Sequence, residues 1–275
     1  MPPIITDPSP ASMARGIEEN LIACYAALAV ADGFRDDDAL TTTLTGIPAG
    51  DFNGVFQARF PFDLSADQLE ARIRNILTEL DGWHVPYQWY VMPLSQPPDL
   101  AAHLRACGLR LEGASPGMAV DLHTLNDGVT VPQGFAVAPV RDTAALHTWL
   151  ETSFAGFGMP AAFVEAFMER MQGFDLSTTA SAQLYLGALD GKPVATSMCF
   201  MAAGAAGLYT ISTLAEHRGQ GIGAAMTLAP LREARERGYR IGTLEASKMG
   251  FPVYQRLGFQ QYITIEHYGR SNGAD

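Results

Sequence analysis

A glycine-rich hexapeptide, Arg218-Gly219-Gln220-Gly221-Ile222-Gly223, constrains the fold of this chain more than any other stretch. The run before it, 207–214, has the Ile, Tyr and Thr content of a buried strand, and the run after it, 224–237, is typical of a helix that ends at Gly238. A strand therefore passes through a glycine-rich turn into a helix. Such a turn presents backbone N–H groups with no Cβ in the way, beside the positive end of a helix dipole. This arrangement predicts a site for an anion, and a pyrophosphate suits it best.

Composition limits the classes of partner. The 275 residues are 48% hydrophobic, enough to pack one large domain or two of ordinary size. The net charge of −11 argues against nucleic acid and against an anionic membrane surface as partners. Three scattered cysteines in apolar surroundings (Cys24, Cys107 and Cys199) favour reduced thiols and a cytoplasmic protein, and no His/Cys cluster predicts a metal site. The N-terminus lacks the basic and apolar regions of a signal peptide.

One uncharged stretch of about 23 residues, 193–215, is long enough to suggest a transmembrane helix. It is interrupted by the small residues 203–207 and carries several Ser and Thr side chains. Two buried strands joined by a turn of small residues explain the stretch better, and we therefore expect no membrane partner.

Periodicity and turn residues predict a mixed order of helices and strands along the chain. We expect helices at 13–31, 65–80, 97–107, 143–154, 160–173, 224–237 and 251–257. We expect strands at 39–45, 55–60, 87–92, 118–122, 135–140, 183–189, 194–201, 207–214, 240–246 and 259–268. Ser65 is the expected N-cap of its helix, and Pro230 should kink the helix that follows the glycine loop.

The turn-rich segment 126–134 predicts a domain boundary, which gives domains at 1–126 and 127–275. The two halves show a possible repeat, because strand, helix, strand, short helix, glycine and strand describe both 55–122 and 208–268. Only the second copy has the glycine loop. We therefore expect a phosphate site in the second domain alone.

The glycine loop admits three interpretations. The glycines could simply make a tight turn before a helix. Alternatively, Gly219-x-Gly221-x-x-Ala224 satisfies a dinucleotide-binding fingerprint, with Glu245 about 20 residues later. The context opposes this second alternative, because four residues separate the strand from the first glycine and only 30 residues follow Glu245.

A third interpretation uses the whole stretch. Arg218-x-x-Gly221-x-Gly223 after a buried strand, followed by a helix, a strand and Tyr254-x-x-Leu257-Gly258-Phe259, resembles the GNAT superfamily of acyl-CoA-dependent N-acetyltransferases. The resemblance covers roughly 135–268. It implies an α/β (α+β) fold of two tandem GNAT-like domains, each a mixed, mostly antiparallel sheet flanked by helices, the first domain being a degenerate copy without the phosphate loop.

The resemblance also implies roles for individual residues. Acetyl-CoA would be the cosubstrate, with its pyrophosphate on the loop of Arg218, Gly219, Gln220, Gly221, Ile222 and Gly223 and its pantetheine along Ile211, Ser212 and Thr213. Tyr254 would protonate the leaving thiolate. Ser247 would be a further cofactor contact, although the family often has Asn at this position. No base is obvious. Glu245 is the first candidate, Glu216 the second, and a water chain is equally possible.

The acceptor half of the site is less constrained. The aromatic segment 154–158 between two expected helices could line an acceptor pocket. We expect an N-acetyltransferase that acts on a primary amine of a small molecule or peptide by direct attack in a ternary complex, as a monomer or homodimer. An acyl-CoA-binding regulatory module with little or no turnover is the alternative.

Overall fold

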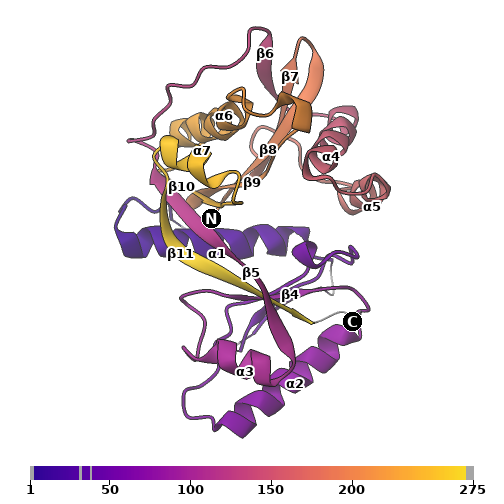
Figure 1. Ribbon diagram of the computed structural model, residues 1–275, viewed down its shortest axis with the longest axis vertical. Coiled ribbons are helices and arrows are strands. Elements are labelled where there is room, and N and C mark those ends of the chain that lie inside the picture. The colour runs from indigo at the N-terminus through magenta and orange to yellow at the C-terminus, as the bar shows by residue number, and fades with distance from the viewer. Residues whose placement is uncertain (1–2, 31–32, 38, 271–275) are drawn as a thin grey trace. The chain divides into compact units, whose positions relative to one another are not determined.

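The computed structural model describes residues 3–30, 33–37 and 39–270 of the chain (Figure 1). The chain divides into two compact units. Unit 1 comprises Met1–Asn20 and Gly117–Tyr262, and unit 2 comprises Leu21–Pro116 and Ile263–Asp275. Each unit therefore draws on both halves of the sequence.

The sheet of unit 1 contains one parallel pair among antiparallel neighbours. In spatial order its strands are the end of β5 (Leu109–Asp121), β10 (Ile241–Glu245), β9 (Ala205–Thr213), β8 (Lys192–Ala202), β7 (Ala182–Leu189) and β6 (Phe135–Pro139). β9 and β10 run parallel to each other, and every other neighbouring pair is antiparallel. The sheet is thus mixed and mostly antiparallel, as the resemblance implied. It is not the parallel sheet typical of a dinucleotide-binding fold.

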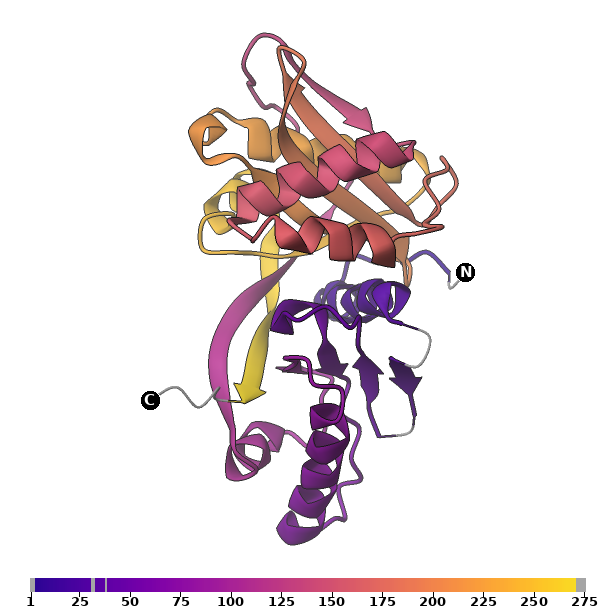
Figure 2. The same cartoon turned by 90° about the vertical axis from the view of Figure 1, so that its right-hand side faces the viewer.

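Helices cover both faces of this sheet (Figure 2). α4 (Thr143–Phe157) and α5 (Ala162–Arg170) lie on one face, and α6 (Ile222–Glu236) lies on the other. α4 begins where the Asp142 side chain accepts a hydrogen bond from the Ala145 N–H, and it ends at Gly158, whose left-handed conformation stops the helix. The short helix α7 (Phe251–Arg256) follows β10. α6 runs as one helix through Pro230.

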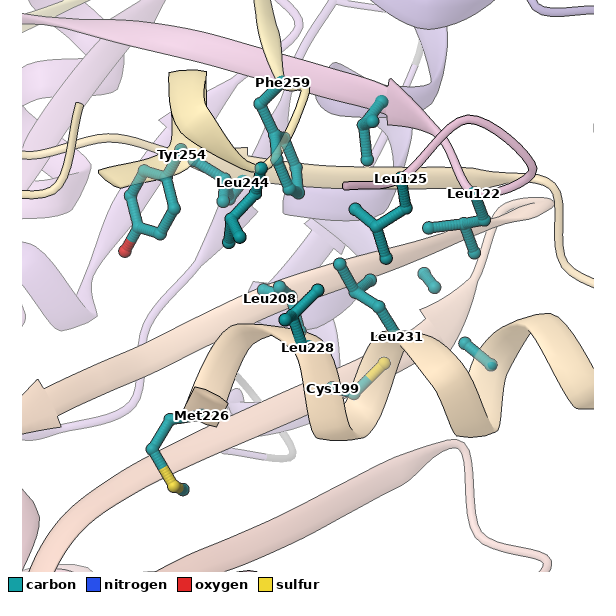
Figure 3. Close-up of a cluster of buried hydrophobic side chains, with 14 of the residues drawn as sticks. Leu122, Leu125, Cys199, Leu208, Met226, Leu228, Leu231, Leu244, Tyr254 and Phe259 are labelled. Atoms are coloured by element: carbon teal, nitrogen blue, oxygen red, sulfur yellow. The ribbon is translucent and has the colours of Figure 1, made fainter. Parts of the chain in front are cut away.

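The core of unit 1 lies between α6, α7 and the sheet (Figure 3). Leu208, Met226, Leu231, Leu244 and Phe259 are all at most 3% exposed. The first four come from the two strands of the parallel pair and from the helix between them, and Phe259 lies between α7 and β11. This apolar burial fixes β9, α6 and β10 as one rigid block.

A buried asparagine joins α1 (Pro10–Leu28) to the β8–β9 hairpin within unit 1. The Asn20 amide donates hydrogen bonds to the carbonyls of Phe200, Ala202 and Ala205 at 3.0, 2.9 and 3.0 Å. The Tyr209 hydroxyl donates to its amide oxygen at 2.7 Å. Four polar partners therefore satisfy one side chain that is fully buried.

Unit 2 has its own strands and its own hydrophobic core. The strands lie in the order β1 (Phe34–Asp36), β2 (Thr41–Thr43), β3 (Gly54–Phe56), β4 (Gln88–Val91) and β11 (Gln260–Arg270). The helical segments are η1 (Gly50–Phe52), α2 (Ala66–Asp81) and α3 (Leu100–Ala106). Ser65 caps α2 in a reciprocal capping box with Gln68, so the predicted N-cap is confirmed.

The predicted repeat is visible in the topology. β3 and β4 form a parallel pair around α2, just as β9 and β10 form a parallel pair around α6. The strand after each short helix, however, pairs in the other unit. Residues 117–121 of β5 pair with β10, and residues 266–268 of β11 pair with β4. The division into units therefore does not coincide with the predicted boundary after residue 126, because each unit takes one strand from the other half of the sequence.

Two further predictions concern single segments. No helix in the described ranges is long and apolar enough to cross a membrane. The uncharged stretch 193–215 instead forms most of the β8–β9 hairpin, as predicted. The first helix was predicted to end at Ala31, which lies outside the described residues, whereas α1 ends at Leu28.

Candidate active site

One cavity of about 350 Å³ in unit 1 joins the elements that the sequence singled out. Nine of the predicted site residues line it: Ile211, Ser212, Thr213, Arg218, Gly219, Gly221, Gly223, Ser247 and Tyr254. Gly156 and Phe157, from the aromatic segment 154–158 expected at the acceptor pocket, also line it. The lining is completed by residues that are not among the predicted site residues, namely His217, Ala224, Met249, Gly250, Val253 and Arg256. The glycine loop, the end of β9 and α7 thus face one common space.

The cavity begins where β9 and β10 part. Their parallel pairing ends at Leu208 and Leu244, and β9 continues to Thr213. In the described chain, residues 210–213 of β9 therefore lie beyond its parallel ladder with β10. An unpaired strand edge can accept an extended chain that bears amides.

A β-bulge turns this edge of β9. Between the pairs Thr196–Ser212 and Met198–Tyr209, one residue of β8 faces two residues of β9. Thr210, in the bulge, has φ +49°, a left-handed conformation that β-branched residues rarely adopt. The Thr196 hydroxyl donates to the Thr210 carbonyl at 3.0 Å and supports the bulge from the next strand. Bulges re-aim the residues next to them, here Ile211 and its neighbours on the cavity wall.

The glycine loop can be built only with glycine at one critical position. Gly221 is the N-cap of α6 with φ +81°, and a Cβ there would collide with the Thr130 carbonyl. Gly219 has φ +75° but faces open space. No side chain caps α6 in this segment, so its first-turn N–H groups remain available to an anion at the positive end of the helix dipole.

The Arg218 side chain braces the loop. Its Nε donates to the Thr213 carbonyl at 3.0 Å, and a terminal nitrogen donates to the Gly156 carbonyl at 2.8 Å. One guanidinium therefore ties the loop to the end of β9 and to the last turn of α4.

The last turn of α4 lies directly on β9. A Cβ on Gly156 would come within 2.6 Å of the Ser212 hydroxyl oxygen, so only glycine allows this approach. The next residue, Phe157, is 52% exposed and lines the cavity. The aromatic segment 154–158 is therefore split. Phe157 lines the cavity, whereas Phe154 is buried against Phe167 with the ring centroids 5.0 Å apart.

Tyr254 supplies a protonated hydroxyl. Its ring packs at the edge of the core near Phe259, while its hydroxyl points away from the cluster (Figure 3). Burial raises the pKa of Tyr254 to about 12, so the phenol keeps its proton at neutral pH and can donate it. A Cβ on Gly250 would come within 2.6 Å of the Tyr254 ring, so this glycine makes room for the tyrosine.

Ser247 has a structural role at the start of α7. Its hydroxyl accepts a hydrogen bond from the Gly250 N–H at 3.1 Å, and its carbonyl accepts one from the Phe251 N–H at 2.9 Å. Ser247 also lines the cavity. The residue at this position thus positions the helix that carries Tyr254, and its contact with a cofactor stays a prediction.

Three predicted site residues do not line the cavity. The Ile222 side chain is 1% exposed and belongs to the core, so only its backbone can serve a ligand. Gln220 is exposed, and its amide donates to the Glu216 carbonyl at 3.5 Å. Glu245 ends β10 outside the lining, so its role as a base has no support from the cavity. A site of three or more His, Cys, Asp or Glu side chains suited to a metal ion does not occur among the described residues.

Comparison with known proteins places this geometry in a family. Residues 143–259 match the model of the acetyltransferase (GNAT) family, and a search among curated proteins finds no match. A GCN5-related N-acetyltransferase from Kribbella flavida superposes with a TM-score of 0.70 at 19% identity, over 94% of this chain and 96% of that one. A GCN5-related N-acetyltransferase from Sphaerobacter thermophilus gives 0.63 at 18% identity, over 96% and 93%.

A tandem GNAT protein from the clavulanic acid biosynthesis pathway gives a TM-score of 0.62 at 17% identity, over 100% of this chain and 91% of that one. At these identities the structural similarity concerns the fold. The family match, in contrast, covers the glycine loop, the β9–α6–β10 block and Tyr254. Residues 143–259 therefore form a domain of the acetyltransferase (GNAT) family, and the protein that carries this domain is an acyltransferase.

Proposed function

We propose that this protein is an N-acetyltransferase that transfers an acetyl group from acetyl-CoA to a primary amine by direct attack in a ternary complex. The observation that carries the proposal is the single cavity that joins an anion-binding glycine loop, an unpaired strand edge and a protonated tyrosine. Acyl transfer from a CoA thioester needs these three functions together.

The residues present fit acetyl-CoA. The loop from Gly219 to Gly223 presents backbone N–H groups without side chains, and it suits the pyrophosphate. The edge of β9 at Ile211–Thr213, beyond the ladder with β10, suits the pantetheine amides. Arg218 and Arg256 place positive charge around the same cavity. The anionic ligand therefore meets local cations in a chain whose net charge is −11.

Acetyl-CoA, when bound, supplies an acetyl group activated as a thioester. A backbone N–H beside the bulge at Thr210 donates to the carbonyl oxygen on which charge develops. Tyr254 donates its proton to the sulfur that leaves.

A thermal melt tests the proposal at its cosubstrate site. A ligand that binds only the folded protein adds about 2.7 kcal/mol of stability at a concentration of one hundred times its dissociation constant. We expect acetyl-CoA and CoA to raise the melting midpoint and NAD⁺ to leave it unchanged. No shift with millimolar acetyl-CoA would overturn the proposal.

Position 223 offers a matched pair of variants. Gly223 lines the cavity in the first turn of α6, and a Cβ there meets its nearest atom, the Thr213 hydroxyl oxygen, at an ordinary 3.8 Å. Both Gly223→Gln and Gly223→Glu should fold, since Gln and Glu favour helices. Only the glutamate adds a negative charge, so it should lose more of the acetyl-CoA shift than the glutamine.

Turnover separates the enzyme from the regulatory module. Release of free CoA thiol on addition of an amine, together with the acetylated amine by mass spectrometry, supports the transferase. A protein that binds acetyl-CoA and turns over no amine in a broad panel would instead be the binding module.

A further inference from the structure

The cavity carries a charge pattern that restricts its acceptor. Among the described residues that line it, none is an aspartate or glutamate, and the ionisable side chains besides Tyr254 are His217, Arg218 and Arg256. The charged side chains of the lining are thus basic, whereas the whole chain has more acidic residues (29) than Lys and Arg (18). An alkylammonium ion would find no carboxylate in this lining to replace its hydration, which is costly.

The same lining offers no strong base to remove a proton from an ammonium ion. Tyr254 has a pKa of about 12 and stays protonated, and Glu245 lies outside the lining. His217 directly precedes the loop residue Arg218, so it belongs to the phosphate end of the cavity. A nucleophile that arrives with a free lone pair needs no such base.

The rim of the cavity is apolar. In the described segment 117–262, the large apolar side chains with strong exposure are Phe157 at 52% and Met249 at 65%, and both line this cavity. Phe157 ends α4, and Met249 precedes α7. An aromatic face and a polarisable thioether both make favourable contacts with an aromatic ring.

We propose that the acceptor is a primary arylamine, whose amino group is uncharged at neutral pH and whose ring binds against Phe157 and Met249. This inference rests on the proposed function. The nitrogen lone pair forms the N–C bond to the acetyl carbon while the C–S bond breaks. The thiolate takes the Tyr254 proton, the nitrogen releases one proton to water, and water returns a proton to Tyr254. The products are an anilide and free CoA thiol.

Calorimetry on the CoA-loaded protein tests the inference without turnover. Aniline and benzylamine share the ring but differ in charge at pH 7, and the amino acid phenylalanine adds a carboxylate. We expect aniline to bind about tenfold more tightly than benzylamine, a difference of about 1.4 kcal/mol. The affinity for benzylamine should rise with pH as its ammonium group loses a proton. Equal or tighter binding of benzylamine or phenylalanine at pH 7 would overturn the inference.

Variants of the rim provide the second readout. Phe157→Ala and Met249→Ala should each weaken aniline binding several-fold and keep a melt shift with CoA. Phe62→Ala is the matched control, because Phe62 is also exposed, at 69%, but does not line the cavity. Rim variants that bind aniline like the wild type would refute the ring site. An absent CoA shift in the wild type would instead refute the proposed function itself.

Discussion

Replacement of Arg218 by alanine tests whether this arginine braces the loop or binds phosphate. Its two hydrogen bonds go to the carbonyls of Thr213 and Gly156 at 3.0 and 2.8 Å. A hydrogen bond contributes a net of about 0.5–1.5 kcal/mol, and Arg218 is exposed, so the pair should contribute about 1–2 kcal/mol. In a domain of this size that loss lowers the melting midpoint by roughly 2–8 °C.

Binding of CoA at several salt concentrations separates the two roles. If CoA must restore the braced loop, the same 1–2 kcal/mol weakens its affinity by about 5–30-fold at every ionic strength. A lost contact with phosphate would instead flatten the salt dependence, because salt screens exposed charges. We expect Arg218→Ala to weaken CoA binding by the same factor at every salt concentration, so that its plot of affinity against salt runs parallel to that of the wild type.

Arg256→Ala is the control for a phosphate contact. Arg256 lines the same cavity, and no hydrogen bond or ion pair engages its guanidinium in the described chain. Its loss should flatten the salt dependence and leave the melting midpoint of the free protein nearly unchanged. If Arg218→Ala flattened the curve as much as Arg256→Ala, the bracing role would be refuted.

Three further sets of variants test the site. Tyr254→Phe should lower kcat about 10²-fold or more with the CoA melt shift retained. Burial raises the pKa of Tyr254 to about 12, whereas a tyrosine in the unfolded chain ionises near pH 10. The wild type should therefore lose stability between about pH 10 and 12, and Tyr254→Phe should lose less of it there. Gly221→Ala should lower the free energy of unfolding in urea by at least about 2–3 kcal/mol, because its Cβ strikes a carbonyl. Gly219→Ala should lower it by only about 1–2 kcal/mol, because a Cβ there faces open space. Equal losses in the two variants would contradict the packing around Gly221. Gly156→Ala should destabilise the protein, and Ser212→Gly should rescue it if the contact between these residues is the cause.

Local chemistry made several elements predictable from the sequence. Ser65 and Gln68 form a capping box that depends only on residues three apart. The glycine loop was predictable because its two left-handed positions, Gly219 and Gly221, are glycines between a strand and a helix. The order of elements from β6 to β11 agrees with the expectation for the same reason, since each element has its own period and its own turn residues.

Contacts between distant segments were not predictable in this way. The bulge places Thr210 at φ +49°, against the preference of a β-branched residue, because pairing with β8 continues on both sides of it. Gly156 gave no local signal of a role, since the reason for it is Ser212, far along the chain. The aromatic segment 154–158 made Phe157 a candidate for the acceptor pocket, whereas Met249 is an ordinary apolar residue in the sequence, and only its exposure at the same cavity distinguishes it.

The domain boundary illustrates the same limit most clearly. Residues 126–134 have the composition of a linker, but strand pairing rather than composition decides which residues belong to a unit. Five residue pairs join β10 to residues 117–121, and Met118, Val120, Leu122 and Leu125 lie in the core beneath the glycine loop's helix. A cut after residue 126 would strip β10 of its antiparallel neighbour and expose that apolar surface to water. Unit 1, which holds the glycine loop, therefore includes the end of a strand that the sequence pattern assigns to the preceding repeat.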